Sequence, residues 1–192
     1  MKTKPNVFVH TVKSRRADNG ALSKLGSQEV DKILKEAEEH FDFDTALHAQ
    51  IAKHAIITNP LSTKRESDTF PSIIVHANNE RHQQHCSHCE QEAEEIRQCI
   101  DDVRNSDYAV LALPSLGGEL MSVIIQTCST QNIPLLLLTP HHVEGYAPRL
   151  IESMDFACFN AGYTSFSDMR NIIDTMFYGK LFEAARQCVN VS

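Results

Sequence analysis

The stretch PSLGGELMSV, residues 114–123, places a hydroxyl, two glycines and a carboxylate where an apolar run ends and a helical pattern begins. Gly117 and Gly118 allow a tight turn and a close approach of the backbone to a ligand. The free N–H groups of the following helix could hold a phosphate or another anion, together with the Ser115 hydroxyl. Glu119 would lie at the mouth of that pocket. The simpler interpretation is an ordinary glycine turn, with Glu119 favouring the positive end of the helix dipole.

Polar residues also lie at the ends of other expected strands. Asp107 opens the strand that leads to the glycine turn, and its type is common in helix-to-strand turns. His10 and His76 end two further apolar runs, so they are expected near one edge of the same sheet. A structural role is the commoner explanation for each of these residues.

A cluster of histidines and cysteines, RHQQHCSHCE, occupies residues 81–90. Cys86 and Cys89 have the spacing of half a zinc knuckle, and His82 is among the nearby histidines that could complete a site. A second ligand pair at a distance is not evident, so a solvated loop that leads into a helix is the favoured interpretation. A redox-active cysteine pair is a third interpretation. The remaining cysteines fit apolar core positions: Cys99, Cys128, Cys158 and Cys188.

Length and composition indicate an ordinary globular protein. The 192 residues are most simply one domain, 1–192, and a net charge of -7 argues against an extended nucleic-acid surface. No stretch approaches the roughly 20 apolar residues that span a bilayer. The first residues lack the apolar region of a signal peptide, which predicts a cytoplasmic protein with free thiols.

The elements expected from the sequence alternate between strands and helices. Periodicity and composition predict strands at 6–12, 71–77, 107–113, 133–139 and 155–161, and helices at 27–41, 44–56, 89–106, 118–131 and 165–186. We expect Ser27 to cap the first helix. The pattern indicates a doubly wound, Rossmann- or flavodoxin-like α/β fold, with a parallel sheet of about five strands and helices on both faces. In such folds ligands bind beyond the carboxyl ends of the strands.

The segment CIDDVRNSDYAVLALPSLGGELMSVIIQTCSTQNIPLLLLTP, residues 99–140, resembles the core of the nucleoside 2-deoxyribosyltransferase family. It is most similar to the branch of 2'-deoxynucleoside 5'-phosphate N-hydrolases. The matching features are Ser106-Asp107 before an apolar strand, Pro-Ser-Leu-Gly at 114–117, Glu119 opening a helix, and Ile-Pro at 133–134 before the next strand.

The resemblance implies an N-glycosidase or deoxyribosyltransferase acting on a small nucleoside or its 5'-monophosphate. Glu119 would be the nucleophile that attacks C1', and Asp107 would position the substrate or protonate the leaving base. Retaining chemistry of this kind expects two carboxyl groups about 5 Å apart. Ser115, Gly117 and Gly118 would hold the phosphate.

The resemblance also bears on binding and assembly. His10 could contact the base or sugar, and Tyr163 could stack on the base. No metal or other cofactor is implied, nor a nucleic-acid polymer or membrane as partner. Active sites shared between subunits in the family imply a homo-oligomer, at least a dimer.

Two alternatives stay open. Only Gly118 separates Gly117 from Glu119, a shorter loop than the family has, so the chain could be a catalytically inactive nucleotide-binding or sensor protein. The second alternative is a zinc-stabilised interaction module built on residues 82–89.

Overall fold

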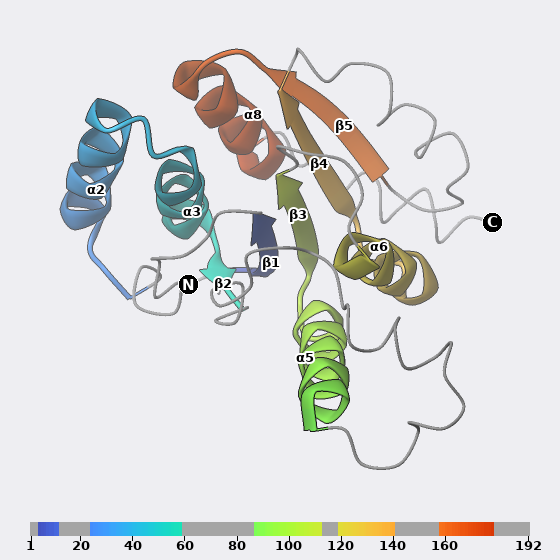
Figure 1. Ribbon diagram of the computed structural model, residues 1–192. Helices are drawn as coiled ribbons and strands as arrows, with labels where there is room; N and C mark the ends of the chain where they lie inside the picture. Colours follow the sequence, from blue (N-terminus) through green and yellow to red (C-terminus); the bar gives the residue numbers. More distant parts are fainter. Residues whose placement is uncertain (1–3, 12–23, 59–86, 113–118, 141–157, 179–192) are drawn as a thin grey trace.

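The computed structural model describes residues 4–11, 24–58, 87–112, 119–140 and 158–178, and every structural statement below concerns these residues (Figure 1). Its elements in chain order are β1 (Asn6–Thr11), α2 (Ser27–Glu39), α3 (Phe43–His54), β2 (Ile56–Ile57), α5 (Ser87–Arg104), β3 (Tyr108–Ala112), α6 (Glu119–Gln131), β4 (Leu135–Pro140), β5 (Cys158–Tyr163) and α8 (Phe166–Tyr178).

The strands form one sheet in the order β2-β1-β3-β4-β5, and every neighbouring pair is parallel. Because parallel strands need crossover connections, helices cover both faces of the sheet. Helices α3 and α8 lie on one face, with α2 packed outside α3, while α5 and α6 lie on the other (Figure 1). The expected doubly wound α/β fold is confirmed.

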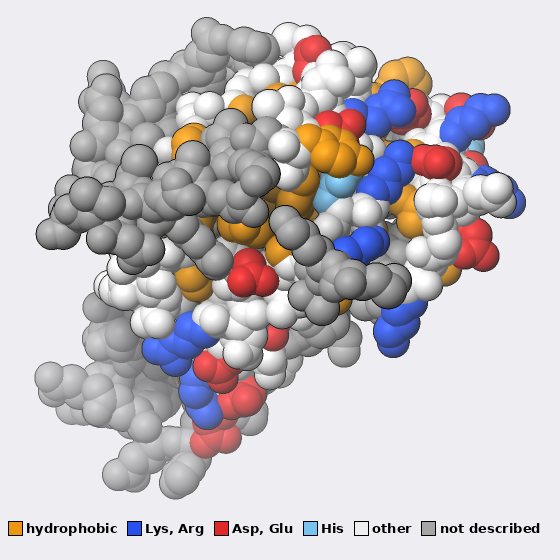
Figure 2. Space-filling view, turned by 180° about the vertical axis from the view of Figure 1, so that it is seen from behind, with side chains coloured by type: hydrophobic (Ala, Val, Ile, Leu, Met, Phe, Trp, Pro, Cys, Tyr) orange, Lys and Arg blue, Asp and Glu red, His pale blue; other side chains and the backbone are white. Residues whose placement is uncertain are grey.

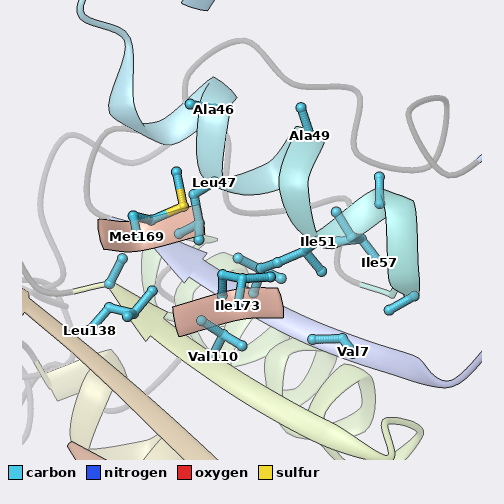
Figure 3. Packing of buried hydrophobic residues seen from close by; sticks show 14 of the residues in the cluster. Val7, Ala46, Leu47, Ala49, Ile51, Ile57, Val110, Leu138, Met169 and Ile173 are labelled. Carbon is cyan, nitrogen blue, oxygen red and sulfur yellow. The ribbon is translucent and has the colours of Figure 1, made fainter. Parts of the chain in front are cut away.

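Side chains of each central strand alternate between two buried clusters. In β1, Val7 and Val9 face the cluster formed with α3 and α8, where Figure 3 shows Val7 near Ile51 and Ile57. Phe8 faces the opposite cluster, with Ile124 of α6. Strands buried on both faces are apolar without interruption, and this explains the apolar runs of β3 and β4.

Two helix starts are fixed by carboxylates. Ser27 was expected to cap α2, but the N-cap is Gly26, and Ser27 is the first helical residue. The Glu29 carboxylate reaches back and accepts the Gly26 N–H at 3.0 Å. Asp42 caps α3 by accepting the Thr45 N–H at 3.1 Å.

Strand β2 is the main difference from the expected elements. Ile56 was expected to end a helix, but α3 ends at His54 and Ala55 is already extended, so Ile56 and Ile57 pair with Asn6 and Val7. The expected strand at 71–77 lies outside the described residues. Strand β5 begins and ends a few residues later than expected. None of the helices in the described ranges is long and apolar enough to cross a membrane.

Candidate functional site

The strand order places a topological switch point between β1 and β3. From β1 the chain continues to β2 on one side of the sheet, whereas from β3 it continues to β4 and β5 on the other. At the carboxyl ends of the two strands Thr11 lies beside Ala112. In doubly wound sheets the crevice at such a point is the usual ligand site.

Helix α6 begins at this edge with Glu119. Strands β3 and β4 are parallel, so α6, which connects them, runs back antiparallel to both. Its thirteen residues extend about 20 Å, comparable to the length of the strands. Ile124 and Cys128 are fully buried against the sheet and fix the helix there. The backbone of Glu119 therefore lies at the carboxyl edge of the sheet, at the free N–H groups of a helix.

Three of the expected phosphate-binding residues lie outside the described residues: Ser115, Gly117 and Gly118. The side chain of Glu119 is not described either. The prediction of a phosphate cradle in the connection between β3 and α6 therefore stays a prediction.

His10 lies near the end of β1, as expected, and is only 5% exposed. A second histidine, His48 of α3, is fully buried and close enough to His10 for the two charges to interact. Burial is the main cause that lowers the pKa of His48; the Asp44 carbonyl and the Asp42 charge partly oppose it, His10 adds a smaller lowering, and the resulting pKa is about 4. His48 is therefore neutral near pH 7.

The neutral His48 ring has a defined tautomer. Its Nδ1 lies 2.7 Å from the Asp44 carbonyl oxygen, which can only accept, so the ring proton is on Nδ1. The opposite nitrogen, Nε2, is buried without a hydrogen-bond partner, and so is Thr11 Oγ1 at the end of β1. Unpaired buried polar atoms call for a bound water or ligand group. Neither residue was predicted from the sequence, because His48 and Thr11 lie within ordinary helical and strand patterns.

Aromatic side chains cluster where β5 ends and where α3 and α8 begin. Tyr163, at the end of β5, stacks on Phe43 with ring centroids 4.4 Å apart, and Phe166 lies 6.0 Å from Phe43. Burial, assisted by Asp44, raises the pKa of Tyr163 to about 12, so its phenol stays protonated. One face of the Tyr163 ring is thus occupied by Phe43.

Asp107 lies at the other end of β3. Its carboxylate accepts the Asn6 N–H at 2.9 Å, and its own N–H donates to the Asn6 carbonyl at 2.8 Å. Five residues of β3 separate this position from the edge where α6 begins, a span of roughly 16 Å. The structure does not bring Asp107 and Glu119 together. Asp107 instead joins the amino ends of β1 and β3.

Residues 81–86 of the histidine–cysteine cluster lie outside the described residues. His82 and Cys86 fall there, and Cys89 is in the first turn of α5 without a described side chain. Within the described ranges, no group of three or more histidine, cysteine or acidic side chains could hold a metal ion. The zinc interpretation stays a prediction.

The described cysteines are packing residues. Cys128 is fully buried, while Cys99 and Cys158 are half-buried beside it in the cluster under α5 and α6. Burial raises the pKa of both Cys128 and Cys158 to about 12, which keeps them as unreactive thiols.

Comparison with known proteins identifies no family for this chain. No protein-family model matches it, and a search of curated proteins finds no significant relative.

Proposed function

We propose that the chain binds a small nucleoside or nucleotide at the β1/β3 switch point and cleaves its N-glycosidic bond with Glu119 as nucleophile. One observation carries the proposal: Glu119 is the first residue of α6, the helix that follows β3, and β3 is one of the two strands that flank the switch point. The resemblance of residues 99–140 to nucleoside 2-deoxyribosyltransferases supplies the chemistry.

The free N–H groups at the start of α6 suit the 5'-phosphate, because the helix dipole favours an anion there. The Glu119 carboxylate attacks C1', the glycosidic bond breaks, and its electron pair leaves with the base. Water then hydrolyses the resulting glycosyl ester and returns the carboxylate. In this proposal His10, near the end of β1, contacts the base or sugar.

The placement of Asp107 favours a second candidate function, nucleotide binding without cleavage. Retaining glycosidases use two carboxyl groups about 5 Å apart. Asp107 holds Asn6 at the amino edge of the sheet, so the acid that the resemblance paired with Glu119 is elsewhere. A chain with only the nucleophile would still bind its ligand.

Base release separates the two functions. We would incubate the protein with the four deoxynucleoside 5'-monophosphates and the matching deoxynucleosides, and measure free base by chromatography. Glu119→Gln removes the nucleophile while keeping the shape of the side chain. Glu36→Gln is the matched control, because Glu36 is an exposed residue of α2 that pairs only weakly with Lys32.

The glycosidase predicts base release that Glu36→Gln retains and Glu119→Gln lowers by at least about a hundredfold, a loss of about 2.7 kcal/mol of transition-state stabilisation. Calorimetric binding without base release would instead support the binding protein. Neither binding nor release would exclude both. The shared active sites implied by the resemblance further predict a dimer, which sedimentation velocity would detect.

A further inference from the structure

A cavity of about 370 Å³ opens at the amino edge of the sheet, opposite the switch point. Its walls come from four parts of the chain: the residue Lys4 before β1, the start of α2, the last turns of α3, and the end of α8. Figure 2 shows lysine, acidic and histidine side chains gathered on the side of the molecule where α2 and α3 lie. The volume is within the range of small-molecule sites.

A histidine–aspartate pair forms the polar floor of the cavity. His54 Nε2 lies 2.7 Å from Asp174 Oδ1, and the same oxygen accepts the Gln50 side-chain amide at 2.6 Å. An ionised carboxylate can only accept, so in neutral His54 the proton is on Nε2 and a lone pair remains on Nδ1. This is the arrangement of an oriented proton acceptor.

Aromatic side chains hold the His54 ring in place. Phe177 stacks on it with centroids 5.1 Å apart, and Tyr178 meets it edge-on at 4.9 Å. The His54 side chain is only 10% exposed, whereas Tyr178 is 76% exposed at the rim. Holding a largely buried histidine in one orientation costs free energy, so we expect His54 to have a role beyond packing.

Gln50 has a hydrogen-bond acceptor with no partner among the described residues. It is 2% exposed, and the bond to Asp174 fixes the amide so that its nitrogen faces the carboxylate. Its carbonyl oxygen is buried without a hydrogen-bond partner. Because Gln50 and His54 are four residues apart on α3, they share one helix face. Two acceptors, Gln50 Oε1 and His54 Nδ1, thus belong to residues that line the cavity, and both suit donors such as hydroxyl groups.

In the lining of the cavity Lys4 and Lys53 balance Asp31 and Asp174, and Lys4 is the lysine that makes no ion pair among the described residues. Asp31 pairs with Lys53 at 2.5 Å, and Asp174 is bound by His54 and Gln50. The Lys4 ammonium donates to the Ala52 carbonyl at 2.9 Å and has no acidic partner among the described residues. Two of its three N–H groups remain for an anion.

We propose that this cavity is a second ligand site, which binds a small hydroxylated anion such as a phosphate monoester of a polyol. The anionic group contacts Lys4, and the hydroxyl groups donate to His54 Nδ1 and Gln50 Oε1. The site is independent of the proposed glycosidase, because it lies at the opposite edge of the sheet.

Nuclear magnetic resonance with three probes tests the proposal. Glycerol 3-phosphate carries both the anion and the hydroxyls, inorganic phosphate carries only the anion, and glycerol carries only the hydroxyls. We expect glycerol 3-phosphate to shift the imidazole resonances of His54 and the side-chain amide of Gln50, and to bind at least about tenfold more tightly than either of the other probes.

Variants assign the two halves of the site. Lys4→Met should weaken binding of glycerol 3-phosphate about tenfold and abolish binding of phosphate. His54→Gln should reduce the affinity for glycerol 3-phosphate to that for phosphate. Lys32→Met is the matched control, since Lys32 is an exposed cation on α2 away from the cavity, and it should change neither affinity.

Several results would overturn the proposal. These are no shift at His54 with glycerol 3-phosphate, equal affinity for phosphate and glycerol 3-phosphate, or equal losses in Lys4→Met and Lys32→Met. Circular dichroism of each variant establishes that it is folded. If His54→Gln does not fold, the comparison of the three probes on the unmodified protein decides the question alone.

Discussion

His48 links the acid sensitivity of the protein to one buried side chain. Its pKa is about 4 in the folded chain and about 6.5 when unfolded, because burial disfavours the charged ring. Between pH 6.5 and 4, His48 binds a proton in the unfolded chain but stays neutral in the folded chain. This contribution to stability is therefore complete above pH 6.5 and is lost progressively as the pH falls to about 4.

We predict that acidification from pH 7 to pH 4 lowers the free energy of unfolding by about 3 kcal/mol through His48 alone. Urea unfolding at a series of pH values measures it. His48→Leu should remove this part of the pH dependence, whatever its effect on stability at pH 7. An unchanged slope between pH 6.5 and 4 in that variant would contradict the assignment.

The residues of the candidate site differ in how far the sequence predicts their positions. The place of Glu119 at the start of a helix was predictable, because a glycine pair after an apolar run marks a strand-to-helix turn. Asp107 was predicted as its partner through the resemblance, but the strand itself separates the two residues. His48 and His54 carry no local signal, since their importance arises only where α3 meets β1 and α8.

A residue with a strained backbone follows the end of helix α2. Phe41 has φ 54°, in the left-handed region, and its side chain is 85% exposed. The Asp42 N–H closes the end of the helix on the Ala37 carbonyl at 2.8 Å, which requires that backbone conformation. A residue other than glycine is strained in this position by about 1 kcal/mol.

Phe41→Gly should therefore raise the free energy of unfolding by up to about 0.5 kcal/mol, because the relieved strain of about 1 kcal/mol is partly offset by the added entropy of the unfolded chain, about 0.5–1 kcal/mol. Phe41→Ala is the control, because it removes the ring and keeps the strain. Chemical denaturation of both variants measures the difference. Equal stability of the two would show that the backbone conformation carries no strain.

Elements were predictable where the pattern was long and unambiguous. The apolar runs of β3 and β4 and the periodic helices α2 and α5 were expected close to their observed bounds. Strand β2 was not, because two isoleucines directly after a helix continue its apolar face. Only pairing with β1 makes them a strand, and that contact is absent from local sequence.

At the scale of the whole molecule, the sheet separates two clusters that stabilise it from opposite faces. Ile173 of α8 is fully buried and lies among the side chains of α3 and the central strands (Figure 3). Since a cavity there would remain largely unfilled, Ile173→Ala should lower the free energy of unfolding by about 2–5 kcal/mol. Ile56→Ala is the control, because Ile56 is 43% exposed in the edge strand β2 and should cost far less. Equal losses would contradict the packing described for α8.

The two edges of the sheet carry different chemistry in this account. The carboxyl edge holds Glu119 at the start of a helix, with unpaired polar atoms on Thr11 and His48. The amino edge holds the cavity with His54, Asp174 and Gln50. A substitution at one edge should therefore leave ligand binding at the other edge unchanged.

Base release, compared between the unmodified protein and Glu119→Gln, is the most direct test of Glu119 as the nucleophile. Chromatography of reactions with the four deoxynucleoside 5'-monophosphates measures free base for the unmodified protein, for Glu119→Gln and for Glu36→Gln. The account predicts release by the unmodified protein and the Glu36→Gln control, and a loss of at least about a hundredfold in Glu119→Gln. Release that continues unchanged in Glu119→Gln would contradict it.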